Sequence, residues 1–175
     1  MPIDSTKEFT PINISVLTIS DTRTEATDKS GQILAKKIRE KGHGLSHKEI
    51  VKDDKEEIKK ILLNWCEDKN VDVIITTGGT GVTGRDTTPE ALNEIKDKEI
   101  PGFGELFRLI SYKKIGASTI QSRALAVLTK GTYIFALPGS TGAVTDAWED
   151  ILKFQLDSRF KPCNFIELMP RLNER

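Results

Sequence analysis

The stretch from Val71 to Ala91 limits the possible folds of this chain more than any other part of its sequence. It begins with a short apolar run rich in β-branched residues, which is too short for a helix and suits a strand covered on both faces. A loop with four glycines between residues 78 and 84 follows, and Thr88 and Pro89 then predict the N-cap and the first residue of a helix. A strand, a glycine-rich turn and a helix in this order are typical of parallel α/β sheets, which bind phosphates at that edge.

Segments with strand and helix patterns alternate along the rest of the chain. This alternation predicts a three-layer α/β/α sandwich with a mostly parallel central sheet. Lys130 and Gly131 are expected to join the last two strands in a hairpin or a tight connection. The strand patterns cover residues 12–20, 45–51, 71–75, 124–128 and 133–137, and the helical patterns cover residues 30–41, 54–65, 89–96, 103–110 and 144–151.

Residues 1–175 are expected to form a single domain, in which residues 1–11 are a flexible N-terminal arm. Phe9 offers an alternative, because its ring could let the arm pack on a neighbouring surface. Phe103 and Phe107 repeat at helical spacing and are expected in the core or in a subunit contact rather than in a ligand site.

Polar residues before two of the helical patterns predict where those helices begin. Ser30 is expected to cap the first helix, which would end before Gly42 in a left-handed turn. Asp54 and Glu57 have the spacing of a capping box for the second helix.

The charge balance excludes two classes of partner. Lys and Arg together number 26, as do Asp and Glu, so nothing favours nucleic acid or an acidic membrane surface. Cys66 and Cys163 are too few and too far apart for a disulfide framework or a metal site. No apolar run approaches the length of a membrane span, and the polar N-terminus lacks the pattern of a signal peptide. The expected location is therefore the cytosol.

The glycine-rich loop is expected to bind an anion. Residues 79–84 match the G-x-G-x-x-G pattern, but the loop follows the third strand and the helix begins four residues later, which excludes a dinucleotide fingerprint. No Walker lysine is present either. What remains is a set of backbone amides at Gly78, Gly79, Thr80 and Gly81 that could surround a phosphate, or else a purely structural turn.

Two carboxylates and two arginines accompany this loop. Asp53 and Asp86 each follow a predicted strand, and carboxylates beside a phosphate site imply a divalent cation such as Mg²⁺. The alternatives are helix capping for Asp53 and an ion pair with Arg85 for Asp86. Arg85 and Arg123 could neutralise phosphate or carboxylate groups. The polar run 21–29 after the first strand either borders the same site or is an ordinary loop.

Several motifs in register resemble those of the MoaB/MogA family of molybdenum cofactor biosynthesis proteins. They are TTGGTG, then RD-x-TPEA, then PGFGE, a Ser-Arg pair and PGST, within a match that runs from Ile12 to Asn164. The resemblance implies a molybdopterin-binding α/β fold that assembles into homotrimers or hexamers. It is closest to the MoaB branch.

The resemblance also implies an activity. In active relatives the terminal phosphate of molybdopterin attacks the α-phosphorus of Mg-ATP, which gives adenylyl-molybdopterin and pyrophosphate. The family's essential aspartates fall on Asp53 and Asp86, which would act in catalysis and hold the Mg²⁺ of Mg-ATP. Its pterin-side pair falls on Ser122 and Arg123. The other substrate-binding residues would be Gly78, Gly79, Thr80, Gly81 and Arg85, with Pro138, Gly139 and Ser140 of the PGST turn.

One residue departs from the pattern of active relatives. Thr141 stands where MogA-type enzymes carry proline in the late PG-x-P loop. The alternative function is therefore a catalytically silent protein that binds molybdopterin or its precursor and delivers it. Both functions require the same small-molecule site and neither requires nucleic acid or a membrane.

Overall fold

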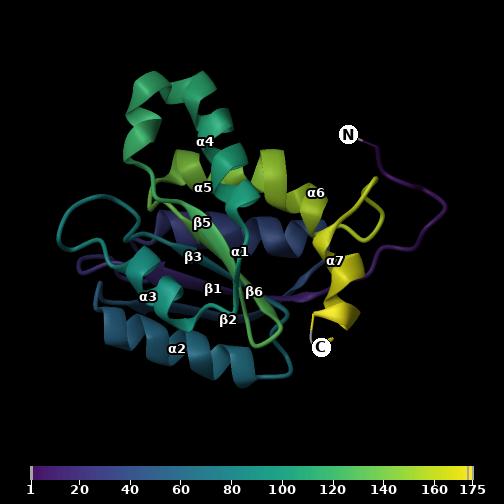
Figure 1. The fold of residues 1–175 in the computed structure, drawn as a ribbon, viewed down its shortest axis with the longest axis horizontal. Helices are drawn as coiled ribbons and strands as arrows, with labels where there is room; N and C mark the ends of the chain where they lie inside the picture. The colour runs from purple at the N-terminus through teal and green to yellow at the C-terminus, as the bar shows by residue number, and fades with distance from the viewer. Residues whose placement is uncertain (1, 173, 175) are drawn as a thin grey trace.

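The computed structural model describes residues 2–172 and 174, and a six-stranded sheet forms its centre (Figure 1). The strand order is β2-β1-β3-β6-β5-β4. The strands are β1 (Asn13–Ile19), β2 (Gly44–Val51), β3 (Val73–Thr77), β4 (Lys98–Glu99), β5 (Leu125–Thr129) and β6 (Thr132–Leu137).

The sheet is mostly parallel, as predicted. β1 pairs in parallel with β2 and β3, and β3 pairs in parallel with β6. β5 runs antiparallel to both β6 and β4. Lys130 and Gly131 have φ values of 49° and 82°, and two positive φ values in a two-residue loop match the twist of an antiparallel hairpin. The hairpin prediction is therefore confirmed.

Helices cover both faces of the sheet, which confirms the three-layer prediction. α1 (Lys29–Lys41), α4 (Pro101–Ile115) and α5 (Thr141–Ala147) pack on one face, and α2 (Lys55–Glu67) and α3 (Thr88–Ile95) pack on the other (Figure 1). The period of two in a strand sends alternate side chains to opposite faces. In β1, Ile14 and Val16 join the core under α1, and Leu17 and Ile19 join the core over α2.

Short helical segments complete the chain. The segment η1 (Gly116–Gln121) is a 3₁₀ helix, in which side chains three apart eclipse, so it carries no amphipathic signal. α5 continues into a π-helical turn, η2 (Trp148–Leu152), and α6 (Lys153–Gln155), in agreement with the predicted helix. Near the C-terminus lie α7 (Phe165–Leu168) and η3 (Met169–Arg171). Within the described residues, no helix is long and apolar enough to cross a membrane. The cytosolic location stays a prediction.

Two helix starts differ by one or two residues from the prediction. Asp28, not Ser30, caps α1, because its carboxylate accepts a hydrogen bond from the Gly31 amide. Thr87, not Thr88, precedes α3, and the buried Thr88 hydroxyl instead donates to the Gly78 carbonyl at 3.0 Å.

The ends of α1 and the start of α2 follow the prediction. Gly42 ends α1 with a φ of 95°. Asp54 accepts hydrogen bonds from the amides of Glu56 and Glu57 at the start of α2.

The aromatic residues of α4 belong to the core. Phe103 and Phe107 are only 4% and 1% exposed, so their predicted alternative as subunit contacts is wrong. The exposed apolar residues of α4 are instead Leu106, Leu109 and Tyr112, with Ile115 at its end.

The N-terminal arm lies against the C-terminal segment. Asp4 donates its amide to the Arg159 carbonyl at 2.8 Å, and Ile3 forms a β-bridge with Phe160. The Phe9 ring lies 5.0 Å from the His43 ring. The arm therefore packs on a neighbouring surface, which is the alternative that Phe9 offers. Its flexibility and the single-domain division stay predictions.

Candidate functional site

Four loops meet at the carboxyl edge of the parallel strands, where open α/β sheets bind their ligands. They follow β1, β2, β3 and β6 and comprise residues 20–28, 52–54, 78–87 and 138–140. Hydrogen bonds join each loop to the next and close a ring. The Asp53 amide donates to Asp21 and thereby joins the loops after β2 and β1, and the Thr87 amide and hydroxyl donate to Asp53 and join the loops after β3 and β2. The Thr77 hydroxyl, at the end of β3, donates to the Pro138 carbonyl. The Arg23 guanidinium donates to the Gly139 carbonyl and joins the loops after β1 and β6.

The loop after β3 requires glycine at its first two positions. Gly78 and Gly79 have φ values of 107° and 63°, which L-residues rarely adopt. A Cβ on Gly78 would lie 2.1 Å from the Ile19 carbonyl oxygen. A Cβ on Gly79 would lie 2.4 Å from the Thr88 hydroxyl. The backbone of this loop therefore approaches its neighbours more closely than any side chain would allow.

Asp86 is a fixed carboxylate inside the same loop. Its Oδ2 accepts hydrogen bonds from the Thr83 amide at 2.9 Å and the Thr83 hydroxyl at 2.6 Å. Burial by itself would raise the pKa of Asp86, but bonds from Thr83 and Gly81 and the charge of Arg123 lower it on balance. Asp86 is therefore an anion at neutral pH. The predicted alternative, an ion pair with Arg85, is wrong, because Arg85 pairs with Asp21.

Asp53 connects the loop after β2 to the start of α3. Its Oδ1 accepts the Thr87 amide at 3.1 Å and the Thr87 hydroxyl at 2.8 Å, and its Oδ2 lies beside Gly79. The neighbouring Asp54 caps α2, so the capping alternative for Asp53 is wrong. Asp53 and Asp86 therefore both border the glycine-rich loop, as the parallel sheet predicts.

A cavity of about 420 Å³ opens between this loop and the start of α5. Most of the predicted site residues line it: Gly78, Gly79, Thr80, Gly81, Asp86, Ser122, Pro138, Gly139 and Ser140. Asp53, Arg85 and Arg123 do not belong to its lining. The structure thus brings together two stretches that are about sixty residues apart in sequence, which the motif order alone cannot show.

The guanidinium of Arg123 contacts the glycine-rich loop. Its Nε donates to the Gly81 carbonyl at 2.6 Å and its Nη2 donates to the Asp86 carbonyl at 2.8 Å, while Glu90 pairs with its charge. The Arg123 amide also donates to the Thr80 carbonyl at 3.1 Å. Arg123 therefore holds the loop in place. Arg85 is largely exposed and pairs with Asp21.

Other lining residues were not predicted, and the expectation that Phe107 lies away from a ligand site is wrong, because it lines the cavity as well as the core. Phe107 and Ile115 of α4 and Ala143 of α5 make an apolar wall, and Ser118, Thr119 and Gln121 of η1 add polar groups. Helical periodicity identifies an apolar face but does not say which part of it borders a cavity. A 3₁₀ turn gives no periodic signal at all.

The site combines amide donors, two carboxylates and a mixed polar and apolar wall. Across residues 2–172 and 174, no three His, Cys, Asp or Glu side chains are grouped so that they could hold a metal ion. Mg²⁺ commonly binds one or two carboxylates and takes its remaining ligands from water and substrate phosphates. Asp53 and Asp86 are the carboxylates beside the glycine-rich loop that could supply such ligands.

Comparisons with known proteins agree with this geometry. The sequence profile of a family described as a probable molybdopterin binding domain matches residues 15–158. Molybdenum cofactor biosynthesis protein B of Escherichia coli K12 is 47% identical over 158 residues, which is 90% of this chain and 93% of that protein. A crystal structure of a molybdenum cofactor biosynthesis protein B superposes with a TM-score of 0.86 at 42% identity, over 97% of this chain and 100% of that one. The tungsten cofactor synthesizing protein MoaB from Pyrococcus furiosus superposes with a TM-score of 0.73 at 36% identity, over 81% and 91% of the two chains.

Proposed function

Because the chain belongs to the family described as a probable molybdopterin binding domain, we propose that it acts in molybdenum cofactor biosynthesis and binds molybdopterin in the cavity at the carboxyl edge of its sheet. The observation that carries this proposal is the convergence of residues 78–81, Asp86, Ser122 and residues 138–140 on one cavity. Amides in a glycine-rich loop attract phosphate, and the apolar wall around Phe107 suits a flat heterocycle.

We further propose that the protein adenylylates molybdopterin with Mg-ATP. An oxygen of the terminal phosphate of molybdopterin would bond to the α-phosphorus, and the bond from that phosphorus to the bridging oxygen would break, so that pyrophosphate leaves. Positioning and charge neutralisation supply most of the catalysis in such transfers. When bound, Mg²⁺ would neutralise phosphate charge between the two anionic substrates.

Each residue of the site has a task in this proposal. Amides of Gly78, Gly79, Thr80 and Gly81 bind phosphate oxygens, and Ser122 and Ser140 contact the pterin substrate. Asp86 is kept anionic by its hydrogen bonds and holds the cation together with Asp53. Arg123 acts through the loop, because its guanidinium donates to the Gly81 and Asp86 carbonyls. Arg85 would leave Asp21 to meet a phosphate.

Pyrophosphate release tests the reaction. Purified protein given molybdopterin and Mg-ATP should release pyrophosphate, and Asp86→Asn should lower that release at least about a hundredfold, as expected when a group that holds transition-state charge is lost. Asp150→Asn is the matched control, because Asp150 is a half-exposed carboxylate in η2 outside the cavity. Circular dichroism melting should show that both variants remain folded. A wild-type protein that releases no pyrophosphate contradicts the adenylylation proposal.

Thr141 favours a second candidate, a catalytically silent protein that binds molybdopterin or its precursor and delivers it. Thr141 is the first residue of α5 and stands where active relatives are expected to carry proline. Titration separates the two candidates. Adenylylation predicts that Mg-ATP and molybdopterin change each other's affinity, and delivery predicts tight pterin binding that ATP leaves unchanged.

We also propose that the protein forms homotrimers or hexamers. The support is an apolar surface on α4 and η1, where Leu109, Tyr112 and Ile120 are 58%, 59% and 84% exposed. Leu109 and Tyr112 lie three residues apart on α4 and so share one face of that helix, and exposed apolar side chains that lie together are typical of protein contacts. A second copy of the chain is the proposed occupant.

A further inference from the structure

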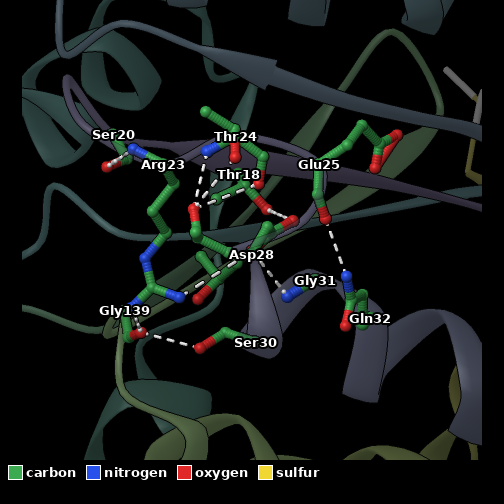
Figure 2. Close-up of polar contacts among 12 residues, drawn as sticks. Thr18, Ser20, Arg23, Thr24, Glu25, Asp28, Ser30, Gly31, Gln32 and Gly139 are labelled. Carbon is green, nitrogen blue, oxygen red and sulfur yellow. Dashed lines mark hydrogen bonds and ion pairs between the residues drawn. The ribbon is translucent and has the colours of Figure 1, made fainter.

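The buried carboxylate of Asp28 lies at the centre of a cluster of polar side chains next to the turn at residues 138–140 (Figure 2). Asp28 is fully buried, and its carboxylate accepts the Thr18 hydroxyl at 2.8 Å and the Gly31 amide at 3.0 Å. Two cations lie near it, Lys48 at 3.6 Å and Arg23 at 4.0 Å. A buried charge is costly unless it is paired and hydrogen-bonded, and here it is both.

The start of α1 is shaped around this carboxylate. A Cβ on Gly31 would lie 2.1 Å from Asp28 Oδ2 and 2.7 Å from the Thr18 hydroxyl, so only glycine fits there. The helix start, the end of β1 and the carboxylate therefore form one rigid unit. Ser30 at the helix start and Arg23 in the preceding loop both reach the turn after β6.

Arg23 and Ser30 converge on one backbone oxygen (Figure 2). The Arg23 Nη2 donates to the Gly139 carbonyl at 3.1 Å, and the Ser30 hydroxyl donates to the same oxygen at 2.8 Å. A carbonyl oxygen has two lone pairs, so both are taken. A hydrogen bond from a charged guanidinium is about twice as strong as one between neutral groups. The Gly139 carbonyl is thus held toward the loop after β1.

The direction of this carbonyl sets the direction of the next amide. The only cis peptide bond in the described residues precedes Pro162, so the peptide from Gly139 to Ser140 is trans. In a planar trans peptide the N–H points away from the C=O. The Ser140 amide therefore faces away from Arg23 and Ser30. Gly139 and Ser140 both line the cavity, and a Cβ on Gly139 would lie 3.4 Å from the Gly78 Cα.

We propose that Arg23 is a positioning residue for the ligand-binding turn, held by Asp28 and assisted by Ser30, and that it keeps the Gly139–Ser140 peptide oriented for an anionic ligand. The proposal rests on the proposed binding of molybdopterin in this cavity. Arg23 contacts the carbonyl side of the peptide and is not part of the cavity lining. Its loss should therefore weaken ligand binding and leave the chemical step unchanged.

The test compares two variants that each remove a cation beside Asp28. Arg23→Ala also removes the donor to Gly139, and Lys48→Ala does not, because the ion pairs of Lys48 are with Asp28 and Glu25. Molybdopterin titration should show a Kd raised about tenfold in Arg23→Ala, as expected for one charged hydrogen bond, and a change below about twofold in Lys48→Ala. Arg23→Lys, which keeps a charged donor, should recover part of the affinity. In pyrophosphate release, KM should rise while kcat stays within about twofold.

A measurement without ligand separates this inference from the proposed function. In NMR spectra of the free protein, the Gly139 carbonyl carbon should shift further in Arg23→Ala than in Lys48→Ala, because only the first variant removes its hydrogen bond. If wild-type protein binds no molybdopterin, the proposed function fails, and the carbon shift still tests the positioning. Equal Kd changes in the two alanine variants, or an unmoved Gly139 carbon in Arg23→Ala, would overturn the inference.

Discussion

The substitution Gly78→Ala places a methyl group at the point where the glycine-rich loop meets the end of β1. The new Cβ would lie 2.1 Å from the Ile19 carbonyl oxygen, well below the 3.0 Å that real Cβ contacts respect. The φ of 107° at this position is itself unfavourable for an L-residue. The change therefore adds a steric clash with backbone and a strained conformation at one residue.

The two effects can be given rough magnitudes. A residue held in a disfavoured φ/ψ region costs about 1–3 kcal/mol, and overpacking a tight site costs about 1–3 kcal/mol more. Gly78→Ala should therefore lower the free energy of unfolding by about 2–6 kcal/mol. That is a large part of the roughly 5–15 kcal/mol by which domains are stable. The loop should also shift, so molybdopterin binding should weaken with stability.

Urea unfolding followed by circular dichroism measures this loss. With an m-value of about 2 kcal/mol/M, the midpoint of Gly78→Ala should fall by about 1–3 M. Gly84→Ala is the matched control, because Gly84 is in the same loop and a Cβ there meets no atom within 4 Å. Its stability should stay within about 0.5 kcal/mol of wild type. Equal midpoints for the two variants would refute the idea that close backbone approach shapes this loop.

Three further predictions concern the packing of the core, the apolar surface of α4 and the stability of the protein at acid pH. Phe107→Ala should lower the free energy of unfolding by about 3–5 kcal/mol in urea titrations, because the ring is fully buried, and Phe107→Leu should cost less. Leu109→Asp should convert the proposed trimer or hexamer to smaller species in sedimentation velocity, and a wild type that sediments as a monomer would contradict the proposed assembly. Burial, with the nearby charge of Lys41, lowers the pKa of His43 to about 4. The unfolded chain therefore takes up this proton first, so stability is complete above pH 6.5 and falls as pH drops from 6.5 to 4. His43→Asn should flatten the unfolding free energy across that window.

The main layers of the fold follow from local patterns. β1, β3 and β6 are runs of apolar residues buried on both faces, and such runs stand out in a sequence. The two-residue strand β4 is too short to give any periodic signal. Asp28 and Ser30 are both good capping residues, and the choice between them depends on the buried contacts with Thr18 and Gly31. Those contacts join segments that only the folded chain brings together.

The location of the candidate site could be predicted from the sequence, but the hydrogen bonds between its residues could not. Because carboxyl ends of parallel strands share one edge, Asp53, Asp86 and the glycine-rich loop could be placed together from sequence. The task of Arg123 could not, since its partners Gly81 and Asp86 lie about forty residues away in the chain. The same holds for Arg23, because most strands of the sheet lie between Arg23 and its partner Gly139 in the sequence. For the polar run 21–29 the sequence left two possibilities open, a border of the site or an ordinary loop, because its contacts with Asp53 and Gly139 depend on tertiary packing.

The central claim is that the loop after β3 and the turn after β6 hold one ligand between them. Hydrogen–deuterium exchange with and without molybdopterin tests it most directly, because bound phosphate protects the amides that donate to it. Exchange should slow most in peptides that cover residues 78–86 and 139–142. Unchanged exchange in both segments, with protection on the outer surface of α4 or along the N-terminal arm, would contradict the account.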